Sequence, residues 1–307
     1  MRIAAAQVRC PWLDPSGGTA AVLDVLTRAA ADQVELVAFP ETFLSGYPFW
    51  VKHTGGARFN DPDHKRAYAA YLDAAVELDG PELSTITTAV RDLGVFTYLG
   101  ITERVRGTVY CTLVAISPQA GIVSAHRKLM PTHDERLVWG AGDGHGLRTH
   151  RVGDLTVGGL ICWENWMPAA RQALYAQGED LHVSVWPGSS RATTDIARFI
   201  ALEGRVYSLA VGGLFSYADV PADFPFHDRL AERASSCDGG SAIAGPDGQW
   251  IVPPVSGEER LITADIDLMT VRGERQNFDP AGHYARPDVF SLKVDRRRLV
   301  PTTFQDD

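Results

Sequence analysis

The apolar positions of this chain follow two different periods. Runs typical of buried strands occupy residues 3–8, 34–39, 95–104, 108–117, 122–127, 155–161, 181–186, 211–217, 241–245 and 260–266. Residues 19–32, 63–78, 81–93, 167–177 and 193–209 instead repeat apolar side chains at the spacing of one helix face, and Pro81 suits a first helical turn. Strands that alternate with helices predict an α/β fold.

The two halves of the chain carry a similar pattern. A helix followed by VELVAFP, residues 34–40, matches a helix followed by LHVSVWP, residues 181–187. We interpret this match as a pseudo-duplicated α/β unit, although two short apolar strands can also agree by chance. Two such units predict a four-layer αββα sandwich, with two sheets face to face and helices outside. We expect one domain over residues 1–292 and a short, charged, frayed tail over 293–307.

Composition narrows the class of protein. The chain has 307 residues, of which 45% are hydrophobic and 22% charged, and its net charge is -9. This charge argues against general nucleic-acid binding, which usually needs a basic face. No apolar run approaches the roughly 18 residues of a membrane span, and the first residues lack a signal-peptide pattern. We therefore expect neither nucleic acid nor membrane as a partner.

One of the four cysteines stands in an unusual position. Cys10, Cys111 and Cys237 match no motif and are read as structural, and the wide spacing of all four favours a reduced, cytoplasmic protein. Cys162 follows the strand-like run 155–161 and precedes a helical segment. A helix N-terminus there would lower the pKa of the thiol by favouring its anion. The alternative is that Cys162 is also a buried structural cysteine.

Two charged residues stand in the same relation to a strand. Glu41 follows the run 34–39, and Lys128 follows the run 122–127. A nucleophilic thiol needs a proton acceptor and a group that stabilises developing charge. Taken alone, Glu41 could cap a loop and Lys128 could be a solvated charge. Together with Cys162 they predict an active site at one edge of a sheet.

Four longer segments surround or follow these residues. They are FPETFLSGYP (39–48), HRKLMPTHDER (126–136), CWEN (162–165) and GHYARPD (282–288). In these segments, and in their order and spacing, the chain resembles the nitrilase, or carbon–nitrogen hydrolase, superfamily. The resemblance covers nearly the whole chain, and the motifs together are far more specific than any one of them.

The resemblance implies a catalytic triad of Glu41, Lys128 and Cys162. It also implies a second glutamate seven positions after the lysine, where Glu135 lies; the alternative for Glu135 is a surface acid. Two features resemble those of true nitrilases: Trp163 directly after the cysteine, and the Gly-Tyr-Pro of residues 46–48. Amidase branches more often carry tyrosine directly after the cysteine. The family relation further suggests that aromatic side chains line the substrate channel, although each could instead pack in the core; these are Tyr47, Trp139, Trp163 and Trp186.

The implied reaction needs no metal or organic cofactor. Glu41 would take the thiol proton and activate water, Lys128 would stabilise negative charge, and Glu135 would help protonate the departing nitrogen. The substrate would be a small-molecule nitrile, converted to a carboxylic acid and ammonia through a thioimidate and a thioester. We expect the protein to be a homo-oligomer. Two alternatives stay open: an amidase with the same triad, and a catalytically silent scaffold protein.

Two further patterns suggest other chemistry. The glycine-rich GAGDGHG of residues 140–146 invites a phosphate-loop reading, but it neither follows a clear strand nor opens a helix. A functional loop near the mouth of the site is the preferred interpretation. His126, His133, His145 and His150 could suggest a metal site, but their spacings match no common zinc pattern. We expect His133 to pack near the pocket instead.

Overall fold

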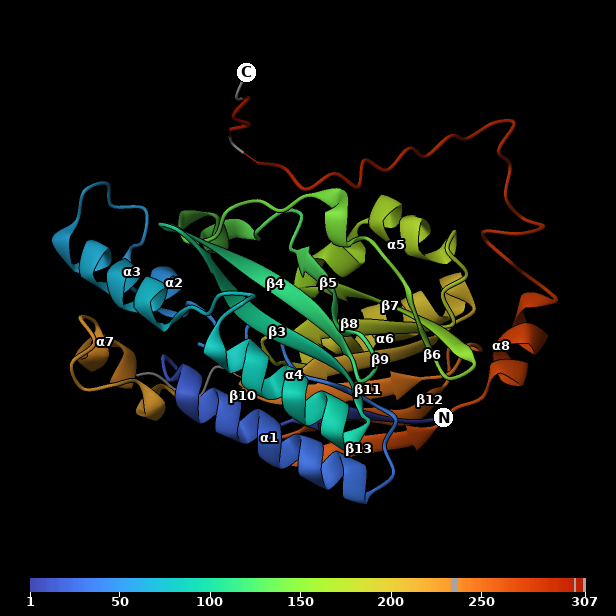
Figure 1. Ribbon diagram of the computed structural model, residues 1–307, viewed down its shortest axis with the longest axis horizontal. Coiled ribbons are helices and arrows are strands. Elements are labelled where there is room, and N and C mark those ends of the chain that lie inside the picture. Colours follow the sequence, from blue (N-terminus) through green and yellow to red (C-terminus); the bar gives the residue numbers. More distant parts are fainter. Residues whose placement is uncertain (233–236, 301, 306–307) are drawn as a thin grey trace.

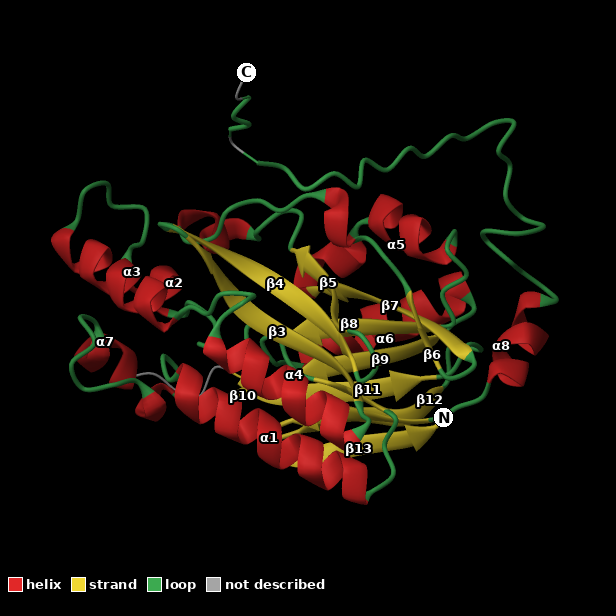
Figure 2. Ribbon diagram, viewed as in Figure 1, coloured by secondary structure: helices red, strands yellow, loops and turns green. Residues whose placement is uncertain are grey.

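Two mixed β-sheets pack face to face, with helices on both outer faces (Figure 1 and Figure 2). This is the αββα sandwich that the sequence predicts. The structure is a computed structural model, and it describes residues 1–232, 237–300 and 302–305. The strands are β1 Arg2–Gln7, β2 Leu36–Ala38, β3 Phe96–Val105, β4 Thr108–Ser117, β5 Gly121–Arg127, β6 His150–Val152, β7 Leu155–Ile161, β8 Leu181–Trp186, β9 Tyr207–Gly212, β10 Leu214–Phe215, β11 Cys237–Ala244, β12 Trp250–Ser256 and β13 Arg260–Asp265. The helices are α1 Pro15–Ala31, α2 Trp50–Thr54, α3 Pro62–Ala74, α4 Pro81–Leu93, α5 Pro168–Tyr175, α6 Ser190–Gly204, α7 His227–Ala231 and α8 Leu268–Arg275.

The order of the strands confirms the pseudo-duplicated unit. In the first sheet, β1, β2 and β3 are parallel neighbours, with β13 antiparallel on one side and β4 and β5 antiparallel on the other. In the second sheet, β7, β8 and β9 are parallel neighbours, with β6 antiparallel on one side and β11 and β12 on the other. The matched strands β2 and β8 are therefore each the middle strand of a parallel triple.

Alternation along the strands decides which layer each side chain joins. In β1, Ile3 and Ala5 face the core between the sheets, whereas Ala4 and Ala6 face α1 and α4. In β9, Leu209 faces the inter-sheet core and Ala210 faces α6. Strands buried on both faces in this way produce the nearly continuous apolar runs of the sequence.

Proline and a polar residue set where the main helices begin. Asp14 accepts a hydrogen bond from the backbone of Gly17 and is followed by Pro15 at the start of α1. Asp61 and Pro62 do the same for α3, and Pro81 opens α4 as predicted. Within the described residues, no helix combines the length and apolar character needed to cross a membrane.

Several predicted boundaries are wrong. The helix expected over 63–78 is α3, which ends at Ala74. The helix expected over 193–209 is α6, which ends at Gly204, and Arg205 then turns the chain with φ of 51°. Apolar residues continue at helical spacing beyond this point, but Tyr207 to Gly212 pair in parallel with β8 and form β9. The expected strand 211–217 is correspondingly short, because β9 ends at Gly212 and only Leu214–Phe215 continues as β10.

The end of the chain is not frayed where it passes the glycine-rich segment. Arg298 pairs with Asp143 at 3.0 Å and donates to the carbonyl of Ala125 at 2.6 Å, and the Leu299 N–H donates to Asp143 at 2.8 Å. The tail crosses the molecule as an extended segment before these contacts (Figure 1). The expectation of a frayed tail is therefore wrong for residues 298 and 299.

Candidate active site

The ends of three strands bring the predicted catalytic residues together. Glu41 lies just past β2, Lys128 directly follows β5, and Cys162 directly follows β7, so both sheets contribute. The Lys128 Nζ lies 2.8 Å from the Glu41 Oε1 and 2.6 Å from the Glu135 Oε2. The sulfur of Cys162 and one carboxylate oxygen of each glutamate all lie within 4.8 Å of one another. All four side chains are buried.

The loop that carries Glu41 is pressed against the first sheet. The Glu41 N–H donates to the Trp186 carbonyl at 3.3 Å, which ties the loop to the second sheet. A Cβ at Gly100 of β3 would lie 2.1 Å from the Pro40 carbonyl oxygen, so glycine is required for this close approach. The Glu41 Oε1 accepts from Lys128 and, at 3.4 Å, from the Cys111 thiol. The Glu41 Oε2 has no hydrogen-bond partner among the described residues, so it is available to accept a proton.

Burial changes the protonation equilibria of this cluster. Burial raises the pKa of Glu41 to about 7, since the charge of Glu135 adds to the effect of burial and Lys128 only partly opposes it. For Lys128, burial disfavours the ammonium, but the electrostatic interactions with the acidic groups Cys162, Glu41 and Glu135 outweigh it and raise the pKa well above its usual range.

The predicted low pKa of the nucleophile is wrong. Burial, followed by the charge of Glu41, raises the pKa of Cys162 well above its usual range. A short 3-10 turn, Cys162–Trp166, separates the thiol from α5, which begins only at Pro168, so no long helix dipole ends at the sulfur. Cys162 therefore rests as a thiol and needs a base to become a nucleophile.

Three donors fix the second glutamate. Glu135 lies in the 3-10 turn His133–Leu137, where its Oε2 accepts the backbone N–H of Thr132 at 2.5 Å as well as Lys128. Its Oε1 accepts the Tyr47 hydroxyl at 2.7 Å. Glu135 is therefore held beside Lys128 from the pocket side, and it is not a surface acid.

Sequence reasoning missed Glu164, a buried carboxylate that ties two strand ends together. Its Oε1 accepts the Leu129 N–H at 2.6 Å, and its Oε2 accepts the Ile161 N–H at 3.0 Å. These are the neighbours of Lys128 and Cys162. His126 contacts the same carboxylate at 3.0 Å, and although burial acts to raise the pKa of Glu164, His126 and the two N–H groups lower it. The available signal was an acid within the CWEN motif, two positions after Cys162.

Comparisons with known proteins agree with this geometry. Residues 2–276 match the carbon–nitrogen hydrolase family. The chain belongs to this family. A nitrilase of Bradyrhizobium diazoefficiens is 38% identical, covering 91% of this chain and 87% of the relative. An aliphatic nitrilase of Sinorhizobium fredii is 35% identical, covering 89% and 88%.

Solved structures share the fold of this carbon–nitrogen hydrolase at low identity. A superfamily protein of Xanthomonas campestris has a TM-score of 0.69 and 20% identity, covering 92% of this chain and 96% of that one. An amidase of Nesterenkonia sp. AN1 has a TM-score of 0.66 and 19% identity, covering 90% and 97%. Both likenesses concern the fold alone.

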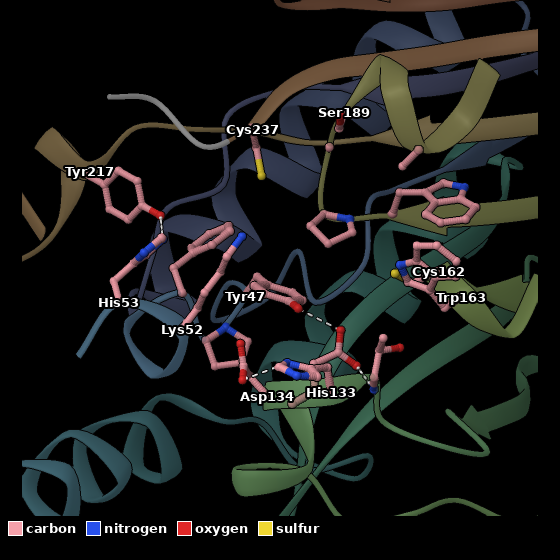
Figure 3. A pocket seen from close by; sticks show the side chains of 18 residues that line it. Tyr47, Lys52, His53, His133, Asp134, Cys162, Trp163, Ser189, Tyr217 and Cys237 are labelled. Atoms are coloured by element: carbon pink, nitrogen blue, oxygen red, sulfur yellow. Dashed lines mark hydrogen bonds and ion pairs between the residues drawn. The ribbon is translucent and has the colours of Figure 1, made fainter. Parts of the chain in front are cut away.

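A cavity of about 420 Å³ is lined in part by Cys162, the predicted nucleophile (Figure 3). Tyr47, Trp163 and Trp186 line it, as the sequence suggested, and so does His133. Trp139 lies outside the lining: it is buried behind Lys128, whose Nζ is 5.4 Å from the ring centroid. Other lining residues that sequence reasoning missed are Phe49, Lys52, His53, Tyr217 and Cys237.

The glycine-rich segment is not part of this lining. Residues 140–146 pack on the strand that carries Lys128, where a Cβ at Gly142 would lie 2.1 Å from the Arg127 carbonyl oxygen. Asp143 of this segment also accepts the hydrogen bonds of Arg298 and Leu299 from the C-terminal tail. Its role is to support β5, and the expectation of a functional loop at the mouth of the site is wrong.

The four histidines do not converge. His126 binds Glu164, His145 contacts the Arg296 carbonyl, and His150 contacts the Ser124 hydroxyl. His133 stands at the cavity with Asp134 at 2.9 Å. Glu41, Glu135 and Cys162 are close enough to share an ion, but the Lys128 ammonium already lies between the two carboxylates. A cation there would have to displace Lys128.

Proposed function

We propose that this carbon–nitrogen hydrolase is a nitrilase, which converts an organic nitrile and two waters to a carboxylic acid and ammonia. The observation that carries the proposal is the convergence of a buried thiol, a carboxylate oxygen without a partner among the described residues and a buried ammonium, with the thiol in the wall of the cavity. Relatives named nitrilase at 38% and 35% identity support nitriles as the substrate class. Trp163 after the nucleophile supports the same choice.

In the first half of the reaction, the Oε2 of Glu41 takes the proton of Cys162. The sulfur then attacks the nitrile carbon, and the negative charge that builds on the nitrogen lies beside Lys128. The proton that Glu41 took then passes to this nitrogen, which gives a thioimidate and returns Glu41 to its carboxylate form.

In the second half, Glu41 activates water, which adds to the thioimidate carbon and gives a tetrahedral intermediate. Glu135 helps to protonate the nitrogen, the carbon–nitrogen bond breaks and ammonia leaves, so a thioester remains. A second water, again activated by Glu41, cleaves the carbon–sulfur bond, which releases the carboxylic acid and restores the thiol. If sulfur left before nitrogen, the product would be an amide.

The test is a panel of nitriles and amides, each scored for both ammonia and carboxylate. A nitrilase releases both from nitriles. Turnover of amides alone would instead support the amidase alternative, whose fold the Nesterenkonia structure shares. No release of ammonia from any compound would support the silent scaffold.

Assembly and location form a second part of the proposal. Large apolar side chains remain exposed on and near α6, namely Trp166, Phe199 and Leu202, which supports a homo-oligomer. Cys10, Cys111 and Cys162 are free thiols, which supports the cytoplasm. Light scattering tests the first point, since a mass of one chain at micromolar concentration would overturn it.

A further inference from the structure

Behind the nucleophile, on the side away from the cavity, lies a second buried polar group. Asn165, His182 and Glu179 are all inaccessible to solvent. The Asn165 Nδ2 donates to the Cys162 carbonyl at 2.8 Å, the His182 Nε2 lies 2.8 Å from the Asn165 Oδ1, and the His182 Nδ1 lies 3.0 Å from the Glu179 Oε1. Three side chains thus form one line that ends on the backbone of the nucleophile.

The direction of each hydrogen bond in this line follows from chemistry. A carbonyl oxygen only accepts, so the Asn165 amide nitrogen must face Cys162. Its Oδ1 must then accept from the His182 Nε2. The proton between the His182 Nδ1 and Glu179 leaves either an imidazolium with a carboxylate or a neutral imidazole with a carboxylic acid. Either form holds the Nε2 as a donor to Asn165.

The backbone that this line contacts is strained. Cys162 has φ of 52°, in the left-handed region that a residue with a Cβ adopts at a cost. Such a conformation persists only where the surroundings fix it. Arg171 adds a second contact, since its Nη1 donates to the Asn165 carbonyl at 2.7 Å.

The hydrogen bond from Asn165 to the Cys162 carbonyl also fixes the direction of the Trp163 N–H, because both groups belong to the same peptide bond. In a planar trans peptide, the C=O and the N–H point in opposite directions. With the Cys162 carbonyl held by Asn165, the N–H of the same peptide, which belongs to Trp163, points to the opposite side, and both Cys162 and Trp163 line the cavity. A backbone N–H fixed in that place stabilises negative charge on the sulfur and on an anion formed next to it.

We propose that Glu179, His182 and Asn165 are positioning residues, which orient the Cys162–Trp163 peptide so that the Trp163 N–H faces the reacting atoms. The inference rests on the proposed cysteine chemistry. Gly158 of β7 fits this role, because a Cβ there would lie 2.3 Å from the Glu179 Oε1 and would close the space that this carboxylate occupies.

The test compares two buried amides in the full-length protein. Asn165→Leu removes the donor to Cys162, and Gln7→Leu removes an equally buried amide that joins β11 to the segment before β13, away from the nucleophile. Two measurements are made on each: the rate at which iodoacetamide alkylates Cys162, read by peptide mass spectrometry from pH 5 to 10, and kcat and KM for a nitrile.

Asn165→Leu should lower kcat by about 10²- to 10³-fold, as the loss of one anion-stabilising donor does. KM should change little, and alkylation should slow in parallel. His182→Gln should lower kcat and the alkylation rate less than Asn165→Leu does, and Glu179→Gln should lower them less again. Gln7→Leu should keep both rates even if its melting temperature falls.

Parental kcat and parental alkylation in His182→Gln and Glu179→Gln would overturn the proposal, and these milder variants keep it testable if Asn165→Leu does not fold. The proposed function fails separately: in that case the parent protein is alkylated at Cys162 but releases no ammonia from any nitrile.

Discussion

Both sheets are built around three parallel strands with antiparallel strands on either side, but they differ at the carboxyl ends of the parallel strands. In the first sheet, β1 ends at Gln7, whose amide accepts from the Ser241 N–H and donates to the Glu258 carbonyl, each at 3.0 Å. The equivalent strand β7 ends at Ile161 and is followed by the strained Cys162, whose thiol lies close to Glu41 and Glu135. The end of β1 connects parts of the fold, whereas the end of β7 leads to the proposed nucleophile.

The middle strands differ in the same way. Glu41 follows β2, whereas Pro187 and Gly188 follow β8 and form part of the cavity wall. The Glu41 N–H donates to the Trp186 carbonyl, so these two equivalent ends meet directly. The comparison teaches that the duplicated sheets supply a frame, while the one or two residues past each strand decide the chemistry.

The largest effect should come from the end of β7. Cys162→Ala removes the nucleophile, so turnover should fall below detection, a loss on the order of 10⁶-fold. Its melting temperature should stay within a few degrees of the parent. Cys10→Ser, which keeps a donor for the Phe43 carbonyl, is the matched control and should retain activity. A substrate adduct on Cys111 or Cys237 would contradict the assignment.

At the end of β2, Glu41→Gln keeps the size of the side chain but removes the base. A positioned base contributes about 10²- to 10⁴-fold, and Glu41 serves in more than one step, so we expect a loss at the upper end. Rapid-quench mass spectrometry should also show little covalent adduct. Rapid adduct formation in this variant would mean that another group takes the thiol proton.

The pH dependence sharpens this test. A base works when it is unprotonated, so with the pKa of Glu41 raised to about 7, kcat/KM should rise as the pH increases through about 7. The residual activity of Glu41→Gln should lack this limb. An acid limb near pH 4.5 in the parent would show that Glu41 behaves as an ordinary carboxyl.

Glu135→Gln should have a smaller effect. The amide keeps a hydrogen-bonding group near Tyr47 and Lys128 but loses the negative charge beside Lys128, which we expect to help the departing nitrogen take up a proton. The variant should form the adduct, turn over slowly and release a larger fraction of amide, measured by quantifying amide and acid in parallel. An unchanged rate and product ratio would leave a site of three residues.

The smallest effect on activity should come from the end of β1. Gln7→Leu leaves the buried N–H of Ser241 without its partner, which costs about 1–3 kcal/mol. Denaturant unfolding should show this loss at an unchanged kcat. If kcat falls as well, the ends of β1 and β7 are coupled, and the end of β1 does not have a purely structural role.

The sequence allowed the sandwich, the duplication and the four clustered residues to be predicted, because strand periodicity and the motifs are local signals. The end of α6 at Gly204 could not be read, since apolar spacing continues past it and only pairing with β8 makes Tyr207 a strand residue. The strand β12 was missed because Pro253 and Pro254 interrupt its pattern; it pairs only with β11, where missing N–H groups are tolerated.

Parts of the site depend on contacts that no local pattern contains. Whether Trp139 lines the cavity or lies behind Lys128 is decided by the packing of side chains far apart in the sequence. The carboxylate of Glu164 binds backbone groups 35 and three positions away, so its role appears only once the strands are placed. The pKa of Cys162 likewise follows from burial by both sheets.

The contacts of the last residues set a boundary for protein engineering. Asp143 is almost fully buried, and Arg298 and Leu299 supply two of its donors beside the strand that carries Lys128. An affinity tag or a surface linker added after the final residue keeps these donors. A tag that replaces residues 293–307 would leave a buried carboxylate short of partners next to the active site. In an immobilised or fused enzyme, these charged residues belong with the catalytic domain.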